Sequence, residues 1–219
     1  MNEPRKPRLG KDFRPGYIFG EKAEYSDKRR ASADLETLLK ARKRDKHGDW
    51  AFNETPLKDY SHTPNINFES ELLKRLDEAR REGRKLRVLD IGVGKGGQWL
   101  EVLEHPALDF HGTSLSRHFH PQLKGLVRIC QAKDLHKKFE QASFDVIASH
   151  AGLHGHELAG VENILWLLKP HGLAVISVED KQVEIRNAIN SRVHGITPSI
   201  VHNSLRYLET FAFTKIPPK

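Results

Sequence analysis

The 219-residue chain has a single cysteine, Cys130, and no apolar run of the roughly 18 residues that a membrane span requires. One cysteine excludes an internal disulfide framework and is typical of a protein in a reducing compartment. The N-terminus is basic but lacks the apolar segment of a secretory signal. We therefore expect a cytoplasmic protein that contacts no membrane, with Cys130 as a small core residue in a strand.

Hydrophobic residues make up only 37% of the chain, whereas charged residues reach 30% and leave a net charge of +7. The positive charge is concentrated in residues 1–50, which hold 14 Lys/Arg and 9 Asp/Glu, against 22 and 20 in the rest. We predict a basic, partly helical extension over residues 1–66 and a folded domain over 67–219. The extension either covers a site, binds RNA or another polyanion, or is simply a solvated segment.

An apolar strand over residues 86–91 leads into four glycines within six positions, 92–97. Glycine adopts positive φ at low cost and has no Cβ to block a ligand, so strand, glycine turn and helix indicate a cleft at the end of an α/β sheet. The glycine spacing fits a dinucleotide-binding fingerprint. It does not fit a phosphate loop, which requires a glycine where Leu89 stands and a serine or threonine where Gly96 stands. Asp90 would repel a pyrophosphate and suits a cationic ligand.

Asp90, Gly92 and Gly94 resemble motif I, acidic-x-G-x-G, of the class I S-adenosylmethionine-dependent methyltransferases. Three later stretches resemble further elements of that family in the same order: its second strand at 110–116, its fourth strand and following loop at 144–154, and its fifth strand with the preceding turn at 167–177. The resemblance implies an α/β protein with a Rossmann-like doubly wound sheet, mostly parallel with an antiparallel C-terminal edge. The cofactor that it implies is S-adenosyl-L-methionine.

The same resemblance assigns cofactor contacts to the ends of three strands. They are Asp90, Gly92, Val93 and Gly94 in the glycine turn, Ser114 and Leu115 after the second strand, and Gln131 and Ala132 after the third. Ser114 and Gln131 stand where the family usually has acidic residues, and Ser114 forgoes a charge-assisted bond. Three outcomes stay open: an unusual cofactor site, compensation by other groups, or a fold that no longer binds the cofactor.

Three histidines, His150, His154 and His156, follow the fourth strand, where the family has its substrate pocket. We predict His150 and His154 as catalytic bases, since an imidazole can take a proton from a hydroxyl or amine near neutral pH. The alternative is that they are ordinary polar loop residues. A metal site with His118 and His120 has the right donors but no matching frame, so we predict no metal.

The methyl acceptor, a small molecule or RNA, has no specific signature in the sequence. A non-catalytic protein that binds nucleic acid or acts as a scaffold is the second hypothesis, supported by Ser114, Gln131 and the basic extension. A nicotinamide-dependent oxidoreductase is disfavoured by Asp90 and by the absence of an acidic residue at the end of the second strand.

The apolar pattern predicts alternating helices and strands. Helices are expected over 33–46, 67–82, 96–104, 134–141, 157–168 and 181–192. Strands are expected over 86–91, 108–113, 126–130, 144–149 and 173–178. Residues 200–202 and 207–216 are expected to close the sheet with one or two antiparallel strands.

Overall fold

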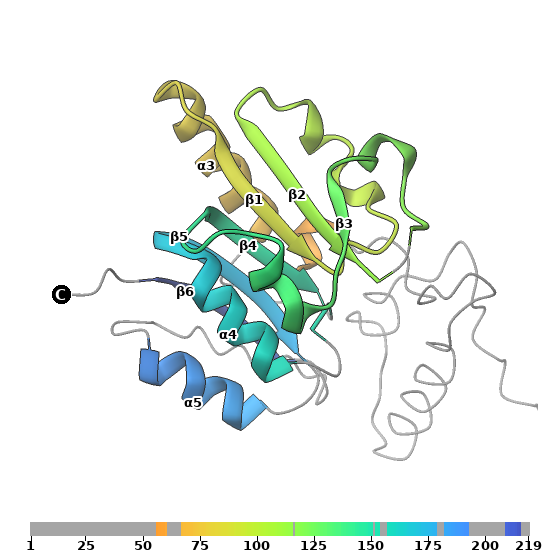
Figure 1. Cartoon of the computed structure of the whole chain (residues 1–219). Coiled ribbons are helices and arrows are strands. Elements are labelled where there is room, and N and C mark those ends of the chain that lie inside the picture. The colour runs from red at the N-terminus through yellow and green to blue at the C-terminus, as the bar shows by residue number, and fades with distance from the viewer. Residues whose placement is uncertain are drawn as a thin grey trace, which may run out of the picture.

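The computed structural model describes residues 56–60, 67–115, 117–150, 152–153, 157–178, 182–192 and 209–215. The predicted helix over 33–46 and most of the predicted extension lie outside these residues. The described residues build one six-stranded sheet with helices on both faces (Figure 1).

The strands of the sheet lie in the order β3-β2-β1-β4-β5-β6. They are β1 (Leu86–Ile91), β2 (Leu108–Ser114), β3 (Val127–Ile129), β4 (Phe144–His150), β5 (Leu168–Val178) and β6 (Glu209–Thr214). The first five are parallel, and β6 pairs antiparallel with β5. This arrangement confirms the predicted doubly wound α/β fold with an antiparallel C-terminal edge. The strand order reverses between β1 and β4, where such sheets have their ligand crevice.

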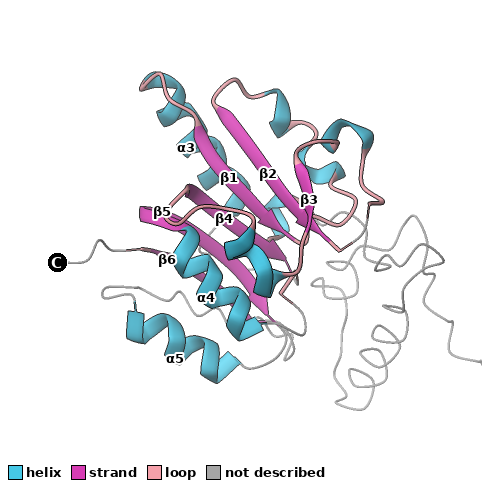
Figure 2. Cartoon of the chain, viewed as in Figure 1, coloured by secondary structure: helices cyan, strands magenta, loops and turns pink. Residues whose placement is uncertain are grey.

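Two hydrophobic layers sandwich the sheet, because successive side chains of each strand point to opposite faces. Leu86 and Val88 pack on the face covered by α3 (Phe68–Arg81), whereas Leu89 and Ile91 pack on the face covered by α4 (Glu157–Leu167) and α5 (Gln182–Arg192). Figure 2 shows α3 behind the sheet and the other two helices in front of it. Asp90, between Leu89 and Ile91, therefore projects toward the α3 face.

Helix α3 follows directly from its sequence. Asn67 caps its first turn by accepting a hydrogen bond from the Ser70 amide at 3.1 Å. A buried stripe at helical spacing faces the sheet: Phe68, Leu72, Leu76 and Ala79. Gly83, with φ of 67°, ends the helix.

The predicted helices over 96–104 and 134–141 are wrong. In their place are short 3-10 helices: η2 (Gly97–Trp99) and η3 (Val102–Glu104) after β1, and η5 (Ala132–Lys137) after β3. Gly96 has φ of 77°, which a helix cannot include. The β3–β4 connection must also return along the sheet within residues 130–143, and a 3-10 helix rises about 2.0 Å per residue against about 1.5 Å for an α-helix.

Two more short helices complete the description: η1 (Leu57–Asp59) and η4 (Pro121–Leu123). Leu57 and Tyr60 are buried in the core on the α3 face, so part of the predicted extension packs inside the domain. Strand β5 begins five residues before its predicted start at residue 173. None of the helices described here is long and apolar enough to cross a bilayer.

Candidate functional site

The glycine turn after β1 is tied to the end of β2. Gly92, Gly94 and Gly96 all have positive φ, at 81°, 59° and 77°. The amides of Gly92 and Val93 both donate to the Thr113 carbonyl, at 3.1 and 2.9 Å. The turn thus presents its backbone at the carboxyl edge of the sheet, beside the residues predicted from the second strand.

The turn also touches the loop after β4, backbone against backbone. A Cβ on Gly92 would lie 2.5 Å from the Gly152 Cα, and a Cβ on Gly152 would lie 1.9 Å from the Ile91 carbonyl oxygen. The Ser149 hydroxyl donates to that same carbonyl at 3.0 Å. The two loops therefore meet directly at the point where the strand order reverses, and Gly152 is the residue type that permits it.

On its other side the turn is covered by the segment that follows β2. A Cβ on Gly96 would lie 2.0 Å from Cδ1 of Leu123, which is fully buried. The His120 amide donates to the Lys95 carbonyl at 2.8 Å. Glycine is required at position 96 because the neighbouring side chains leave no room for a Cβ, so this glycine does not need a bound ligand to explain it.

The predicted cofactor residue Asp90 is completely buried and engaged by aromatic donors. Its Oδ2 accepts hydrogen bonds from the Tyr60 hydroxyl at 2.8 Å and from the Trp99 indole nitrogen at 2.6 Å. The Gln98 amide nitrogen donates in turn to the Tyr60 hydroxyl at 2.8 Å. Asp90 Oδ1 has no hydrogen-bond partner among the described residues.

Burial dominates the electrostatics of this cluster. Loss of water raises the pKa of Asp90 to about 7, against the opposing effect of hydrogen bonds from Trp99 and Tyr60. Burial and the nearby Asp90 charge raise the pKa of Tyr60 well above its usual range. Near neutral pH the Asp90 carboxyl therefore exchanges between its neutral and ionised forms, while Tyr60 keeps its proton.

Tyr60 is the functional-site residue that sequence reasoning missed. Its ring stacks on Phe68 with centroids 5.5 Å apart and lies 5.7 Å from the His150 ring. The Ser177 hydroxyl donates to the Tyr60 carbonyl at 3.1 Å and bonds the Thr210 hydroxyl at 2.9 Å. Leu57 and Tyr60 form an apolar pair three residues apart in a polar stretch, which is the signal that could have revealed a docked turn.

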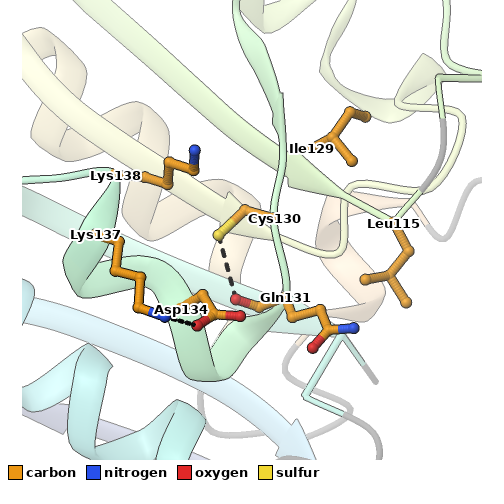
Figure 3. Close-up of a pocket in the computed structure, with 7 residues that line it drawn as sticks. All are labelled: Leu115, Ile129, Cys130, Gln131, Asp134, Lys137 and Lys138. Atoms are coloured by element: carbon orange, nitrogen blue, oxygen red, sulfur yellow. Dashed lines mark hydrogen bonds and ion pairs between the residues drawn. The ribbon is translucent and has the colours of Figure 1, made fainter.

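A cavity of 390 Å³ opens beyond the carboxyl ends of β2 and β3 (Figure 3). Its walls are Leu115, Ile129, Cys130, Gln131, Asp134, Lys137 and Lys138. Leu115 and Gln131 are predicted cofactor contacts, and the fold brings them to one cavity from different strands. Leu115 is 50% exposed and Ile129 43%, so this wall offers uncovered apolar surface.

The polar groups of the cavity are partly paired with each other. Lys137 and Asp134 point toward one another and form an ion pair at 2.7 Å (Figure 3). The Cys130 thiol contacts the Gln131 carbonyl at 3.2 Å, and burial raises the pKa of this thiol. The raised pKa favours the protonated thiol, which is less nucleophilic than a thiolate.

The predicted contact Ala132 is held by helix α4. Asn163 donates from its amide nitrogen to the Ala132 carbonyl at 2.8 Å, and its amide oxygen lies 3.1 Å from Nδ1 of His136. Gly160 lets η5 approach, since a Cβ there would lie 3.2 Å from that of Ala132. The buried Asn163 side chain thus fixes the position of the backbone next to Gln131.

The remaining predicted residues divide between the described part of the chain and the rest. The Ser114 carbonyl accepts a hydrogen bond from the Cys130 amide at 3.0 Å, which closes β2 onto β3. His150 ends β4, half-buried, beside Tyr60. His154 and His156 lie outside the described residues. Within those residues, no three His, Cys, Asp or Glu side chains are grouped as metal ligands would be.

The sequence matches no protein-family model and no curated protein. Similar solved structures include the CurJ carbon methyltransferase, at 14% identity and a TM-score of 0.47 over 61% of this chain. An arsenic(III) S-adenosylmethionine methyltransferase from Chlamydomonas reinhardtii has 15% identity, a TM-score of 0.45 and 62% coverage of this chain. A TehB-like S-adenosylmethionine-dependent methyltransferase from Corynebacterium glutamicum has 15% identity, a TM-score of 0.44 and 67% coverage of this chain.

This chain covers 49% of the CurJ chain, 65% of the arsenic methyltransferase chain and 97% of the TehB-like chain. All three are methyltransferases, the class whose motifs the sequence resembles. Strand order and register define the fold independently of these similarities.

Proposed function

We propose that the protein is an S-adenosylmethionine-dependent methyltransferase. The observation that carries the proposal is the cavity beyond β2 and β3, whose wall includes Leu115 and Gln131. These two residues follow different strands, and the motif resemblance assigns both to the cofactor site and Gln131 to its adenine ring. The acceptor is a small molecule or RNA.

The cavity suits an adenosyl group in size and chemistry. Its 390 Å³ falls within the range of about 300–1,000 Å³ typical of small-molecule sites. The half-exposed Leu115 and Ile129 offer apolar surface to a flat base. The Gln131 amide can both donate to and accept from the edge of an adenine ring.

Asp90 fits the cationic end of the cofactor less simply. Its Oδ2 is held by Tyr60 and Trp99, while the buried Oδ1 has no partner among the described residues. An ammonium group near Oδ1 would supply the missing donor and would favour the ionised carboxylate. The residues therefore fit a sulfonium cofactor if its ammonium group binds to Oδ1 of Asp90.

Bound S-adenosylmethionine supplies a methyl group on a sulfonium, which a nucleophile can take in a single displacement. The protein's own contribution is alignment and the exclusion of water, because methyl transfer depends strongly on the geometry of approach. His150, at the carboxyl end of β4, is the described residue that we assign to take the acceptor's proton. The Gly92–Gly152 contact holds the two flanking loops in place.

The test is isothermal titration of S-adenosylmethionine into the wild-type protein and two matched variants. Leu115→Glu places a charge at the cavity wall, whereas Val183→Glu changes a residue on α5 that is 68% exposed. We expect binding to the wild type and Val183→Glu, and a loss on the order of tenfold or more in Leu115→Glu, since a hydrated carboxylate replaces the apolar surface that would cover the base. Absence of heat at millimolar ligand would exclude the proposal, and heat with NADPH alone would favour the oxidoreductase.

A non-catalytic role is the alternative that the Asp90 cluster supports. Two buried aromatic donors already occupy the carboxylate oxygen Oδ2, and Ser114 provides no charge for ribose hydroxyls. Such a protein would show no S-adenosylmethionine binding yet would fold normally. Cofactor binding and methyl transfer to a panel of small molecules and RNA, measured on the same preparation, distinguish the two roles.

A further inference from the structure

The segment over residues 117–138, which begins after β2 and ends just after η5, is strongly basic; we call it the β3-edge segment. It carries six basic side chains and one acidic one, Asp134. The basic residues are Arg117, Lys124, Arg128, Lys133, Lys137 and Lys138, and all six are exposed. The other described residues carry 13 lysines and arginines against 16 aspartates and glutamates. The net positive charge of the described residues therefore lies on this one segment.

Four of these cations gather at the end of β3 and along η5. The charges of Lys138, Lys137 and Arg128 all act on the Cys130 thiol, and that of Lys133 acts on Asp134. The guanidinium of Arg128 lies 4.6 Å from the centroid of the Phe139 ring and donates to the Lys138 carbonyl. Asp134 is already paired with Lys137, so it neutralises little of the charge on the others.

Protection of an edge strand explains only part of this charge. Strand β3 lies at the edge of the described sheet, and exposed charges on such strands prevent pairing with other chains. Arg128 alone lies on β3 and is enough for that purpose. The other five cations lie on the flanking loops and on η5, where no strand edge needs protection.

We infer that the β3-edge segment binds the phosphate backbone of a single-stranded nucleic acid. Four of the six cations are lysines, which are depleted from protein–protein interfaces, whereas nucleic-acid interfaces are strongly positive. The segment has only short elements, η4, β3 and η5, and no long helix to enter a groove. A surface of this kind holds phosphates without reading a base sequence. The inference does not depend on methyl transfer or on the extension over residues 1–66, although Lys137 and Lys138 of the segment also line the cavity.

The test is fluorescence anisotropy of a labelled single-stranded RNA of roughly 20 nucleotides with the full chain. The triple variant Lys124→Gln, Lys133→Gln, Lys138→Gln removes three exposed charges from the segment. The control, Lys74→Gln, Arg80→Gln, Arg81→Gln, removes three exposed charges from α3. Both variants lower the net charge of +7 by the same amount, so a general charge effect would weaken both alike.

We expect the segment variant to bind RNA on the order of tenfold more weakly, and the control to stay within about twofold. The slope of log affinity against log salt should fall by about 2 in the segment variant only, since each lost phosphate contact on a single strand contributes about 0.7. Lys124→Glu, a single change outside both η5 and the cavity wall, should weaken binding in the same direction. Circular dichroism and melting curves show whether each variant folds as the wild type does.

Four results would overturn the inference. The first is equal weakening in the two triple variants, and the second is wild-type binding that neither the segment triple variant nor Lys124→Glu weakens. The third is displacement of RNA by polyglutamate as readily as by unlabelled RNA, which would indicate an acidic protein partner. Wild-type protein that binds no RNA at moderate salt would equally exclude it.

Discussion

The hydroxyl of Tyr60 donates a 2.8 Å hydrogen bond to the carboxylate of Asp90, 30 residues further along the chain. Both residues are buried, and Trp99 completes the arrangement by donating to the same oxygen at 2.6 Å. The bond attaches a turn that precedes the domain to the first strand of the sheet. Asp90 is therefore an anchor of the fold as well as the acidic residue of the glycine-turn motif.

Tyr60→Phe should lower the free energy of unfolding by about 1–3 kcal/mol, because it leaves buried polar groups unpaired. Asp90 Oδ2 loses one donor, and the Gln98 amide keeps only its longer bond to the Val93 carbonyl, while the ring can still stack on Phe68. Urea denaturation measures the change. Tyr60→Leu should cost more, since it also removes the aromatic contacts. Equal stability of wild type and Tyr60→Phe would contradict a structural role for the hydroxyl.

Asp90→Asn should change how stability depends on pH. The pKa of Asp90 is about 7 in the folded protein and near 3.8 when unfolded, so folding favours the protonated carboxyl. Its contribution to stability is fully present below pH 3.8 and is lost as pH rises through 7, at up to about 1.4 kcal/mol per pH unit. The asparagine variant lacks this slope.

Urea denaturation at several pH values between about 4 and 8 tests this difference, which builds up over the range in which the two pKa values differ. Other titrating groups contribute alike to both proteins and cancel when the variant is compared with the wild type. Parallel pH profiles for the two proteins would show that Asp90 titrates normally in the folded state.

The central strands β1, β4 and β5 were predictable because each contains a short apolar run. The bounds of β1 match the prediction at residues 86–91, and β6 closes the sheet antiparallel within the predicted 207–216. The helices after β1 and β3 were not predictable from periodicity. Whether such a segment forms an α-helix or a 3-10 helix depends on how far the connection must reach, and a local pattern does not contain that distance.

The site divides in the same way. Leu115 and Gln131 were predictable because a parallel sheet brings the residues after neighbouring strands to one edge. The apolar pair Leu57 and Tyr60 indicates a docked turn but not its contacts, because Asp90 and Ser177 lie 30 and 117 residues from Tyr60 and no local pattern links them. The burial of Asp90 follows from that contact and was equally invisible in the sequence.

Gly152→Ala should destabilise the protein by several kcal/mol or prevent folding. Its Cβ would lie 1.9 Å from the Ile91 carbonyl oxygen and 2.9 Å from the Gly92 Cα, both backbone atoms that cannot move aside alone. Gly83→Ala is the control, because its Cβ meets nothing within 4 Å and only the positive φ of 67° is strained, at a cost of about 1 kcal/mol. Equal melting temperatures for the two variants would show that the loops after β1 and β4 are not in contact.

Asn163→Leu should both destabilise the protein and perturb the cavity. The substitution keeps a side chain of similar size but removes the donor to the Ala132 carbonyl and the acceptor beside His136, at an expected cost of about 1–3 kcal/mol. The matched change Asn187→Leu, at an exposed position on α5, should cost little. Ala132 follows Gln131 directly. Loss of the hydrogen bond to the Ala132 carbonyl should therefore also lower the affinity for any ligand that Gln131 contacts. Titration of the two variants with S-adenosylmethionine therefore separates them by affinity as well as by melting temperature, and equal affinities would mean that Asn163 stabilises η5 without positioning Gln131.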